Sequence, residues 1–593
     1  MNLQRPLITG IFWALLFTTA CRQAPASHSV QREAPIFHWD SLPALIPFVG
    51  DTVQYGLGGV FAGTHHGVCI LAGGTNFRGQ PFWQGGTKHW YPHIMVFDPD
   101  EGTWQQQDIT LPRRLSYGVA ISTSEGMFLI GGRDARHISR KVYLLRYDEA
   151  QKQVLIDSLS DLPLPLCFMS GARVGDAIYL AGGMDSLGGT LQKHFYRLSL
   201  KGNLKQNRWE KLSPWQGAAR LLPTVVAQSD GRRECLFLFG GQFPRKGQPN
   251  EYLSDAYRYN PDTGEWTQIA DIQDAEGGKK PLFASLGAKV GSSHVALFGG
   301  VDGSINRQLE QLQLDLATAK DSFEIRRLKD RQKDLLTHHP GFYRKVLIYH
   351  SITDRWREGE EMPYPACITT TAFWMDNQLI IPSGEISPGR RSPRVYKIAL
   401  AKQEGQMSVL DYSLLVLYAL VLLGMGGYFA KRQHSTEDYF RGGGRIPWWA
   451  AALSLFGTGL SAITFMAVPA KTFATNWAYL VLSLSIVLVP PVVSKVFIPA
   501  YRKYNISSAF QYLRLRFNRW VQLIGAATFL LFQLGRVGII LYLPALALHV
   551  VLGVNLYWCI GLVGLVSLFY TFMGGIEAVI WTDVFQVIVL VGG

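Results

Sequence analysis

Cys-Ile-Leu-Ala-Gly-Gly, residues 69–74, is the first copy of the pattern that decides the fold of this chain's first two thirds. An apolar run ending in two glycines returns five times, at intervals of 51 to 59 residues and, before the last copy, 84. A second apolar stretch follows each copy, and pairs such as Leu111-Pro112 and Met362-Pro363 come later in the repeats. The later copies are Met127–Gly132, Ala177–Gly183, Leu236–Gly241, Val295–Gly300 and the degenerate Leu379–Gly384.

Repeats of this length and pattern resemble the kelch repeat, a ~50-residue unit that forms one blade of a β-propeller. Two successive glycines suit a tight strand exit, where a Cβ atom would clash. Six copies predict an all-β, six-bladed propeller over residues 37–400; the alternative is an unrelated β-sandwich with chance glycine pairs. The sixth repeat lacks an outer strand, and the segment 37–43 is expected to supply it and close the ring.

The composition excludes several classes of protein. Of 593 residues, 48% are hydrophobic and only 17% are charged, so the chain is neither disordered nor collagen-like nor a disulfide-dense miniprotein. The net charge of +13 raises the question of nucleic acid, but the basic clusters flank apolar runs, as in membrane proteins, and no nucleic-acid partner is expected. No CxxC pair or Cys/His metal spacing occurs, and Cys69 and Cys235 are expected to be buried thiols.

The long interval before the sixth repeat contains an insert, at about 304–344. Leucine and isoleucine residues recur there at helical spacing among charges, which predicts one or two amphipathic helices over one face of the propeller. They are expected either to cover a pocket or to be decoration.

Residues 1–21 are predicted to be a secretory signal. Arg5 precedes a short apolar stretch, 7–17, that is too short to span a membrane. Thr18-Thr19-Ala20-Cys21 then resembles a lipoprotein cleavage box, with Cys21 as the residue that would be lipidated; simple cleavage after Ala20 is the alternative. In both cases the following domain is exported.

A linker at 401–407 leads into a different kind of sequence, residues 408–593. Apolar runs of spanning length lie at about 408–430, 449–470, 477–500, 521–552 and 554–575, and a last one begins near 579. They predict an all-α, multi-pass transmembrane bundle in a lipid bilayer. Because the sequence stops inside an apolar run, it is expected to be an incomplete transporter.

The charges of the loops predict the orientation of this bundle. The loops at 431–447 and 495–519 are rich in lysine and arginine, whereas the alternate connections carry one lysine in total. By the positive-inside rule the two basic loops are cytoplasmic, which places the propeller on the other side. The chain is therefore expected in a bacterial inner membrane with its propeller in the periplasm.

Two loops of the propeller contain residues suited to chemistry. One, at 383–391, includes Glu385 and two arginines, Arg390 and Arg391; the other, at 73–79, includes Asn76, Phe77 and Arg78. In a closed ring these belong to neighbouring blades and are expected to converge. A glutamate beside an arginine can serve as an acid/base group next to a carboxylate-binding group; a structural salt bridge is the alternative.

The spacing Gly-Glu-x-x-Pro-Gly-x-Arg at 384–391, followed around the ring by Gly-Gly-x-x-Phe-x-Gly at 73–79, resembles the bacterial N-acetylneuraminate epimerases, which are kelch sialic acid mutarotases. The resemblance covers about 37–400, in a cyclically permuted order. It implies an isomerase with Glu385 and Arg391 as catalytic residues, and it leaves the register between Arg390 and Arg391 open by one residue. The implied reaction interconverts the anomers of sialic acid and needs no metal or cofactor.

The membrane half also contains unexpected residues. Arg536 and Asp583 lie within apolar runs, where a charge is costly and function is the default interpretation. Glycine and hydroxyl residues at 457–464 interrupt the second run and could unwind it to bind a cation. Tight packing of helices through small residues is the alternative.

These segments resemble the sodium:solute symporter family, from about Asp411 to the end, and the stretch GGIEAVIWTDVFQ at 574–586 is its most specific part. The family implies two inverted five-helix repeats and coupling to Na+. Carried over to this chain, the resemblance implies sodium ligands at Gly457, Leu460 and Asp583 and sialic acid contacts at Ser461, Thr464 and Arg536.

Together, the two halves predict a periplasmic sialic acid mutarotase that supplies a sodium-dependent sialic acid importer. The alternatives are a non-catalytic carbohydrate-binding propeller on a symporter for another solute, and a symporter-like sensor.

Overall fold

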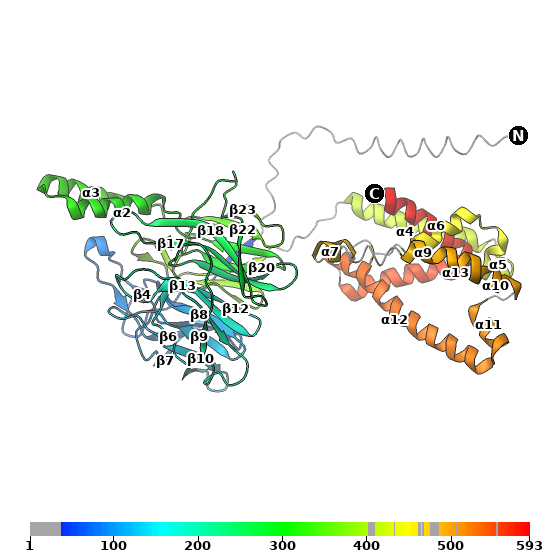
Figure 1. The fold of residues 1–593 in the computed structure, drawn as a ribbon, viewed down its shortest axis with the longest axis horizontal. Helices are drawn as coiled ribbons and strands as arrows, with labels where there is room; N and C mark the ends of the chain where they lie inside the picture. The colour runs from blue at the N-terminus through cyan, green and yellow to red at the C-terminus, as the bar shows by residue number, and fades with distance from the viewer. Residues whose placement is uncertain are drawn as a thin grey trace.

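The structure is a computed structural model of the 593-residue chain. It describes residues 37–400, 409–431, 433–459, 464, 468–474, 485–504, 508–552 and 555–592. Up to residue 400 the chain forms six four-stranded antiparallel sheets, and from residue 409 it is helical (Figure 1). The predicted fold class, a six-bladed β-propeller followed by a helical region, is confirmed.

The six sheets are the blades, and in the first five the strands follow the order of the chain from the central axis outward. Blade 1 contains β2 (Phe61–His65), β3 (Val68–Ala72), β6 (His93–Asp98) and β7 (Thr103–Thr110); blade 2 contains β8 (Val119–Thr123), β9 (Gly126–Ile130), β10 (Val142–Asp148) and β11 (Gln153–Ser158); blade 3 contains β12 (Cys167–Val174), β13 (Ala177–Met184), β14 (Phe195–Ser199) and β15 (Trp209–Lys211). Blade 4 contains β16 (Thr224–Ser229), β17 (Glu234–Phe243), β18 (Glu251–Asn260) and β19 (Glu265–Ile269); blade 5 contains β20 (Leu286–Val290), β21 (His294–Phe298), β22 (Lys345–His350) and β23 (Arg355–Glu361).

Blade 6 closes the ring with a strand from the other end of the propeller. Its sheet runs β24 (Phe373–Met375), β25 (Gln378–Pro382), β28 (Val395–Leu400) and then β1 (Phe37–Leu42). β1 pairs with β28 from Phe37 opposite Leu400 to Leu42 opposite Val395. The predicted closure is confirmed, and the pairing removes a sheet edge that would otherwise be free to associate.

The paired glycines lie where one blade meets the next. A Cβ atom on Gly73 would come within 2.2 Å of the carbonyl oxygen of Leu115, in the loop that enters the next blade. The N–H of Gly74 donates to that same oxygen at 3.2 Å. In the sixth copy Ser383 replaces the first glycine, and its hydroxyl accepts from Leu57 N at 2.7 Å and donates to Ser392 O at 2.7 Å. The glycine pattern therefore reflects contacts between blades.

A ring of residues with positive φ surrounds the central channel at or just before the start of each inner strand. They share left-handed backbone conformation and, in ring order, are Gly59, Tyr117, Phe168, Leu222, Ala284 and Thr369. Backbone hydrogen bonds of 2.6 to 2.9 Å link Thr369 to Gly59 and then each residue to the next as far as Ala284. Below the ring lies a cavity of about 170 Å³ lined by all six blades. The hydrogen bonds of this ring fix the loops at the mouth of the channel.

Apolar side chains fill the spaces between neighbouring sheets, and the four cysteines of the propeller are buried. Cys69 and Cys235 are fully buried, as predicted. Burial raises the pKa of the Cys235 thiol to about 12, and the same effect raises that of Cys167 to about 12. These thiols are protonated packing groups at neutral pH.

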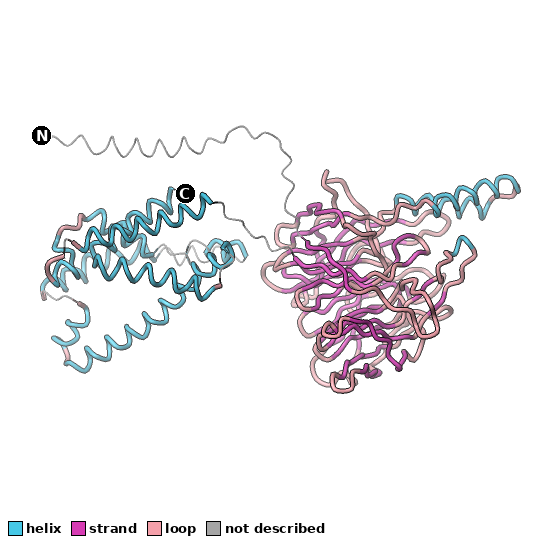
Figure 2. The backbone as a smooth tube through the Cα atoms, turned by 180° about the vertical axis from the view of Figure 1, so that it is seen from behind, coloured by secondary structure: helices cyan, strands magenta, loops and turns pink. Residues whose placement is uncertain are grey.

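The insert in blade 5 forms a helical hairpin of α2 (Ser304–Thr318) and α3 (Ser322–Thr337), so the predicted helices are confirmed. Figures 1 and 2 show the hairpin projecting away from the propeller. Glu310 of α2 attaches it to blade 4 by accepting hydrogen bonds from Tyr252 Oη at 2.6 Å and from Asn250 N at 2.9 Å.

The described part of the C-terminal region consists mainly of helices. Its α-helices are α4 (Val409–Ala430), α5 (Thr436–Arg441), α6 (Trp448–Gly459), α7 (Val468–Ala474), α9 (Ser485–Val492), α10 (Ile498–Lys503), α11 (Ala509–Arg516), α12 (Arg519–Leu552) and α13 (Leu556–Gly592). Three stretches of the described helices are long and apolar enough to cross a bilayer: Tyr412–Ala430, Arg519–His549 and Thr571–Leu590. The helix α13 breaks at Gly575, whose φ of +57° places a turn between two apolar halves.

Polar contacts hold the break in α13. Arg445 donates to Asp438 Oδ1 and to Glu577 Oε2, each at 3.1 Å, and the Gln433 side chain donates to the carbonyl of Gly574. The basic loop before α6 is thereby tied to the middle of α13.

Candidate functional site

A short hairpin in blade 6, between β25 and β28, brings the predicted acid/base residues together. Its strands are β26 (Glu385–Ser387) and β27 (Arg390–Arg391), and Glu385 lies opposite Arg391. The backbone of Glu385 also bridges Ile368, the residue before the Thr369 position of the channel ring. The hairpin is therefore fixed at the mouth of the channel.

Both oxygens of Glu385 accept a hydrogen bond. Oε2 accepts from Arg391 Nη2 at 3.1 Å, and Oε1 accepts from the backbone N–H of Gly389 at 2.8 Å. The Glu385 side chain is 16% exposed and that of Arg391 only 3%. The pair is consequently a largely buried, charge-assisted contact rather than a surface ion pair.

The loop of blade 1 packs against this hairpin, as expected from the closed ring. The guanidinium carbon of Arg391 lies 4.7 Å from the centre of the Phe77 ring. A Cβ atom on Gly389 would meet Trp83 at 2.8 Å, so the turn of the hairpin lies directly against the segment that contains Phe82 and Trp83. Glutamate, arginine and aromatic side chains from two blades thus share one site.

The other predicted residues of the propeller lie differently. Asn76 is buried. Its Nδ2 donates to Gly56 O at 3.1 Å and its Oδ1 accepts from Tyr91 Oη at 2.9 Å, and these two bonds stabilise the loop. Arg78 contacts Tyr91 and Asp51, which raise its pKa above the ordinary value. Arg390 is exposed, so of the two adjacent arginines Arg391 is the one paired with Glu385.

The structure adds residues that sequence reasoning missed. Lys88 Nζ lies 4.6 Å from the centre of the Tyr117 ring, 5.3 Å from that of Trp90 and 6.0 Å from that of Phe77. Tyr117 Oη is 3.1 Å from the buried hydroxyl of Thr75. Lys88 and Trp90 are two positions apart beside the strand β5 (His89–Trp90), a spacing that places side chains on one face and could have indicated the pair.

This arrangement can hold and move a proton. A carboxylate has lone pairs to spare after one hydrogen bond to each oxygen, so Glu385 can accept a proton from a ligand hydroxyl. Arg391 and the Gly389 N–H hold its two oxygens in place. Among the described residues, no group of three or more His, Cys, Asp or Glu side chains is arranged to hold a metal ion.

In the helical region, α6 and α13 bring two predicted sodium ligands close together. Asp583 Oδ2 accepts from Ser454 Oγ at 2.6 Å, and a Cβ atom on Gly457 would lie 3.8 Å from that of Asp583. Thr464 Oγ1 donates to Gly459 O at 3.1 Å, and Arg536 is exposed on α12. The remaining predicted residues, Leu460, Ser461 and Cys21, lie outside the described part of the chain.

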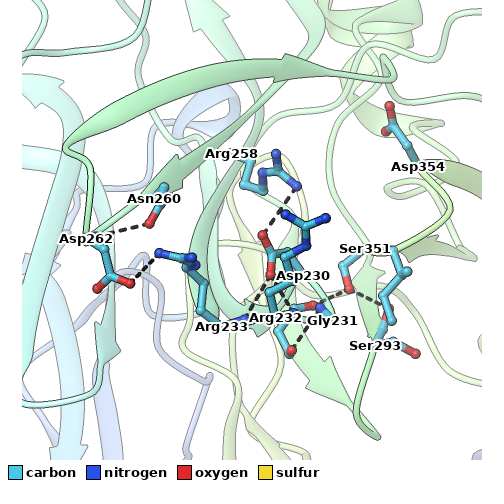
Figure 3. Close-up of polar contacts among 12 residues, drawn as sticks. Asp230, Gly231, Arg232, Arg233, Arg258, Asn260, Asp262, Ser293, Ser351 and Asp354 are labelled. Carbon is cyan, nitrogen blue, oxygen red and sulfur yellow. Dashed lines mark hydrogen bonds and ion pairs between the residues drawn. The ribbon is translucent and has the colours of Figure 1, made fainter. Parts of the chain in front are cut away.

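A second polar cluster lies around the turn between β16 and β17 and the neighbouring turns of blade 5 (Figure 3). Asp230 accepts from the backbone N–H groups of Arg232 and Arg233 at 2.9 and 3.0 Å, and Arg258 Nη1 is 3.5 Å from it. The hydroxyl of Ser351 donates to Ser293 O at 2.9 Å. The Ser351 hydroxyl also donates to Ser229 O of blade 4. These bonds close turns of blades 4 and 5 and link the two blades, which makes the cluster structural.

Comparison with known families divides the chain into two parts. The family model described as N-acetylneuraminate epimerase matches residues 20–155 and 159–436. The model of the sodium:solute symporter family matches residues 439–593. The first match covers more than half of the chain.

Relatives of the second part are sodium-coupled transporters. The chain is 45% identical over 184 residues to the sodium/sialic acid symporter SiaT of Proteus mirabilis, covering 31% of this chain and 37% of that protein. It is 44% identical over 181 residues to the sodium/sialic acid symporter NanT of Aliivibrio fischeri, covering 30% and 36%. A solved structure of a Na+-coupled sialic acid symporter in a substrate-bound outward-open state matches at 44% identity and a TM-score of 0.30, over 31% of this chain and 38% of that one. The chain thus spans little more than a third of these relatives.

Proposed function

We propose, from the premise that this chain belongs to the N-acetylneuraminate epimerase family, that its propeller interconverts the α and β anomers of N-acetylneuraminate. The observation that carries the proposal is the Glu385–Arg391 pair at the channel mouth, on the loop that resembles the epimerase active site. The reaction is an isomerisation, and the substrate is a sugar acid with a carboxylate beside its anomeric carbon.

The proposed chemistry is a pair of proton transfers around ring opening. Glu385 removes the proton of the anomeric hydroxyl, the bond from the anomeric carbon to the ring oxygen breaks, a ketone forms, and the ring oxygen takes up a proton. Rotation about the neighbouring carbon–carbon bond presents the other face of the ketone, and the reverse transfers close the ring. Since the uncatalysed reaction is already fairly fast, one acid/base group is sufficient.

We infer that the helical region belongs to a sodium-coupled importer of the same sugar acid. It matches the sodium:solute symporter family, and two of its relatives are named for sodium and sialic acid. Gly457, Leu460 and Asp583 would contribute to sodium sites, and Ser461, Thr464 and Arg536 to binding of the sugar. The propeller would then convert the anomer that glycosidases release before the importer takes it up.

The proposed location follows from the charges of the loops. The chain is a membrane protein by its family and its apolar helices. We propose that it lies in a bacterial inner membrane with the propeller in the periplasm, since the basic loops at 431–447 and 495–519 favour the cytoplasmic side. Export by residues 1–21 and lipidation at Cys21 remain predictions.

The enzyme activity is tested by following anomer exchange of N-acetylneuraminate by NMR with the full chain in detergent. The wild type should accelerate exchange, and Glu385→Gln should lower the rate by about a hundredfold, within the range that general acid/base catalysis supplies. Glu125→Gln, an exposed glutamate in the turn between β8 and β9, is the matched control and should behave as wild type. Binding of the sugar without faster exchange in the wild type would instead make the propeller a carbohydrate-binding module.

A further inference from the structure

The guanidinium of Arg391 is closed to a ligand in this structure. One nitrogen, Nη2, is used by Glu385, and the Phe77 ring covers the group at 4.7 Å. Nε and Nη1 are buried and have no hydrogen-bond partner within the described residues. Gly58 lies on the other side of the guanidinium. A Cβ atom on this residue would come within 2.9 Å of Arg391 Nε, so no free space remains between them. A carboxylate could reach this group only after Phe77 moved.

Lys88 is a second cation in the same site, and its side chain is only half-buried. It lies against the same Phe77 ring as Arg391, and the Tyr117 and Trp90 rings complete its surroundings. Ring faces attract a cation but do not neutralise it. No described carboxylate lies within 4.0 Å of Nζ, so its charge is not paired within the propeller.

The surroundings of Lys88 favour an anion. It lines a basin of about 670 Å³ between blades 1 and 2, together with Trp90 and several cationic side chains. The one carboxylate of the lining, Asp134, accepts from the backbone N–H groups of its own loop at 2.8 and 2.7 Å. The arginines of the lining are Arg78, Arg113, Arg114 and Arg136. Such an excess of positive charge raises the local concentration of a sugar acid.

We propose that Lys88, held over Tyr117 and Trp90, pairs with the carboxylate of the bound sugar acid, while Arg391 is a positioning residue that holds Glu385. This inference rests on the proposed substrate class. Without Lys88, Arg391 would have to hold Glu385 and also bind the carboxylate of the ligand. Because Arg391 has no exposed donor left, the second task is assigned to Lys88. Both cations lie over the ring of Phe77.

The test measures binding rather than turnover, so it does not depend on whether the propeller is an enzyme. The full chain in detergent is titrated calorimetrically with N-acetylneuraminate and with its methyl ester, which lacks the negative charge. Potassium buffer excludes sodium-dependent binding by the helical region. The variants are Lys88→Met, which keeps the apolar stem among the rings, and Arg136→Gln, which removes one exposed charge of the same basin.

The wild type is expected to prefer the acid to the ester by at least about tenfold, as for a hydrogen bond to a charged group. Lys88→Met should remove this preference by weakening acid binding, with ester binding unchanged, and Arg136→Gln should leave it within about twofold. An unchanged preference in Lys88→Met would overturn the proposal, because another cation would then bind the carboxylate. An equal loss of this preference in Arg136→Gln would also overturn the proposal, because the preference would then come from the overall positive charge of the basin. If the wild type accelerates no exchange but this pattern of binding holds, only the proposed reaction fails.

Discussion

The Glu385 side chain is fixed before any ligand arrives. A backbone N–H and a guanidinium hold one oxygen each, and the residue's own backbone is bonded to Ile368 at the channel ring. An acid/base group held in this way does not need to reorganise during proton transfer. At the scale of single residues, the account therefore depends on the geometry that Arg391 gives to Glu385, and on a separate cation for the ligand.

Another residue, His65, makes the stability of the propeller depend on pH. It is 6% exposed, and its Nδ1 accepts a hydrogen bond from Tyr147 N at 3.0 Å, which requires an unprotonated nitrogen. Burial, and then the neighbouring His66, lowers the pKa of His65 from its ordinary 6.5. Above pH 6.5, His65 is unprotonated in both the folded and the unfolded chain. Below pH 6.5, the unfolded chain binds the proton more readily than the folded chain, so the free energy of unfolding falls as the pH falls.

We therefore expect the midpoint of thermal unfolding to drop between pH 7.5 and pH 5.5, and His65→Asn, which keeps an acceptor and cannot titrate, to flatten that drop. His38→Asn, at an exposed histidine of β1, is the control. Circular dichroism of the β-sheet signal measures the midpoint. Equal slopes for wild type and His65→Asn would contradict the assignment.

At the scale of elements, β1 is the strand whose loss should matter most, because it completes the sheet of blade 6 with a segment from the other end of the propeller. Phe37 is 2% exposed and its ring lies 5.2 Å from that of Phe298 in blade 5. Phe37→Ala should lower the free energy of unfolding by about 3 to 5 kcal/mol, the usual cost of removing a buried phenylalanine. His38→Ala, one position away and exposed, should change it little. Denaturant titration of both variants measures the difference, and similar values would contradict closure by β1.

The helical hairpin depends on one carboxylate. Glu310 accepts from Tyr252, Asn250 and Gln242, and Tyr252 is buried. Glu310→Ala would leave a buried hydroxyl without its acceptor, at a cost of about 1 to 3 kcal/mol. We expect faster amide hydrogen exchange throughout 304–337, with the blades unaffected. Asp330→Ala, on the exposed side of α3, serves as the control, and identical exchange in the two variants would refute the anchoring role.

Local pattern was enough to predict most elements. The glycine pairs indicated the blades because each is needed at a contact between blades, and leucine spacing indicated α2 and α3. The site was predicted only in part. Glu385, Arg391 and Phe77 were placed together by ring closure, but the role of Lys88 depends on Tyr117, which comes from another blade and adopts a φ of +61° that no sequence pattern shows.

At the scale of the whole molecule, the proposed function gives two unlike parts one kind of ligand. The propeller matches a family named for N-acetylneuraminate, and the helical region matches the sodium:solute symporter family, in which two of its relatives are named for sodium and sialic acid. The proposed link is chemical: one part would adjust the anomer that the other carries. Composition predicted the division of the chain, since apolar runs of spanning length begin only after the last blade. It could not predict how the helices pack, because intramembrane contacts such as Ser454 with Asp583 join residues far apart in sequence.

The most direct test follows the α anomer of N-acetylneuraminate from the moment a sialidase releases it from a glycoside. NMR records its decay to the equilibrium mixture with the full chain present, with Glu385→Gln, and with buffer alone. The account predicts a decay rate that rises in proportion to the amount of wild-type chain and stays near the buffer rate with Glu385→Gln. Equal rates for the wild type and buffer, with the propeller folded, would contradict it.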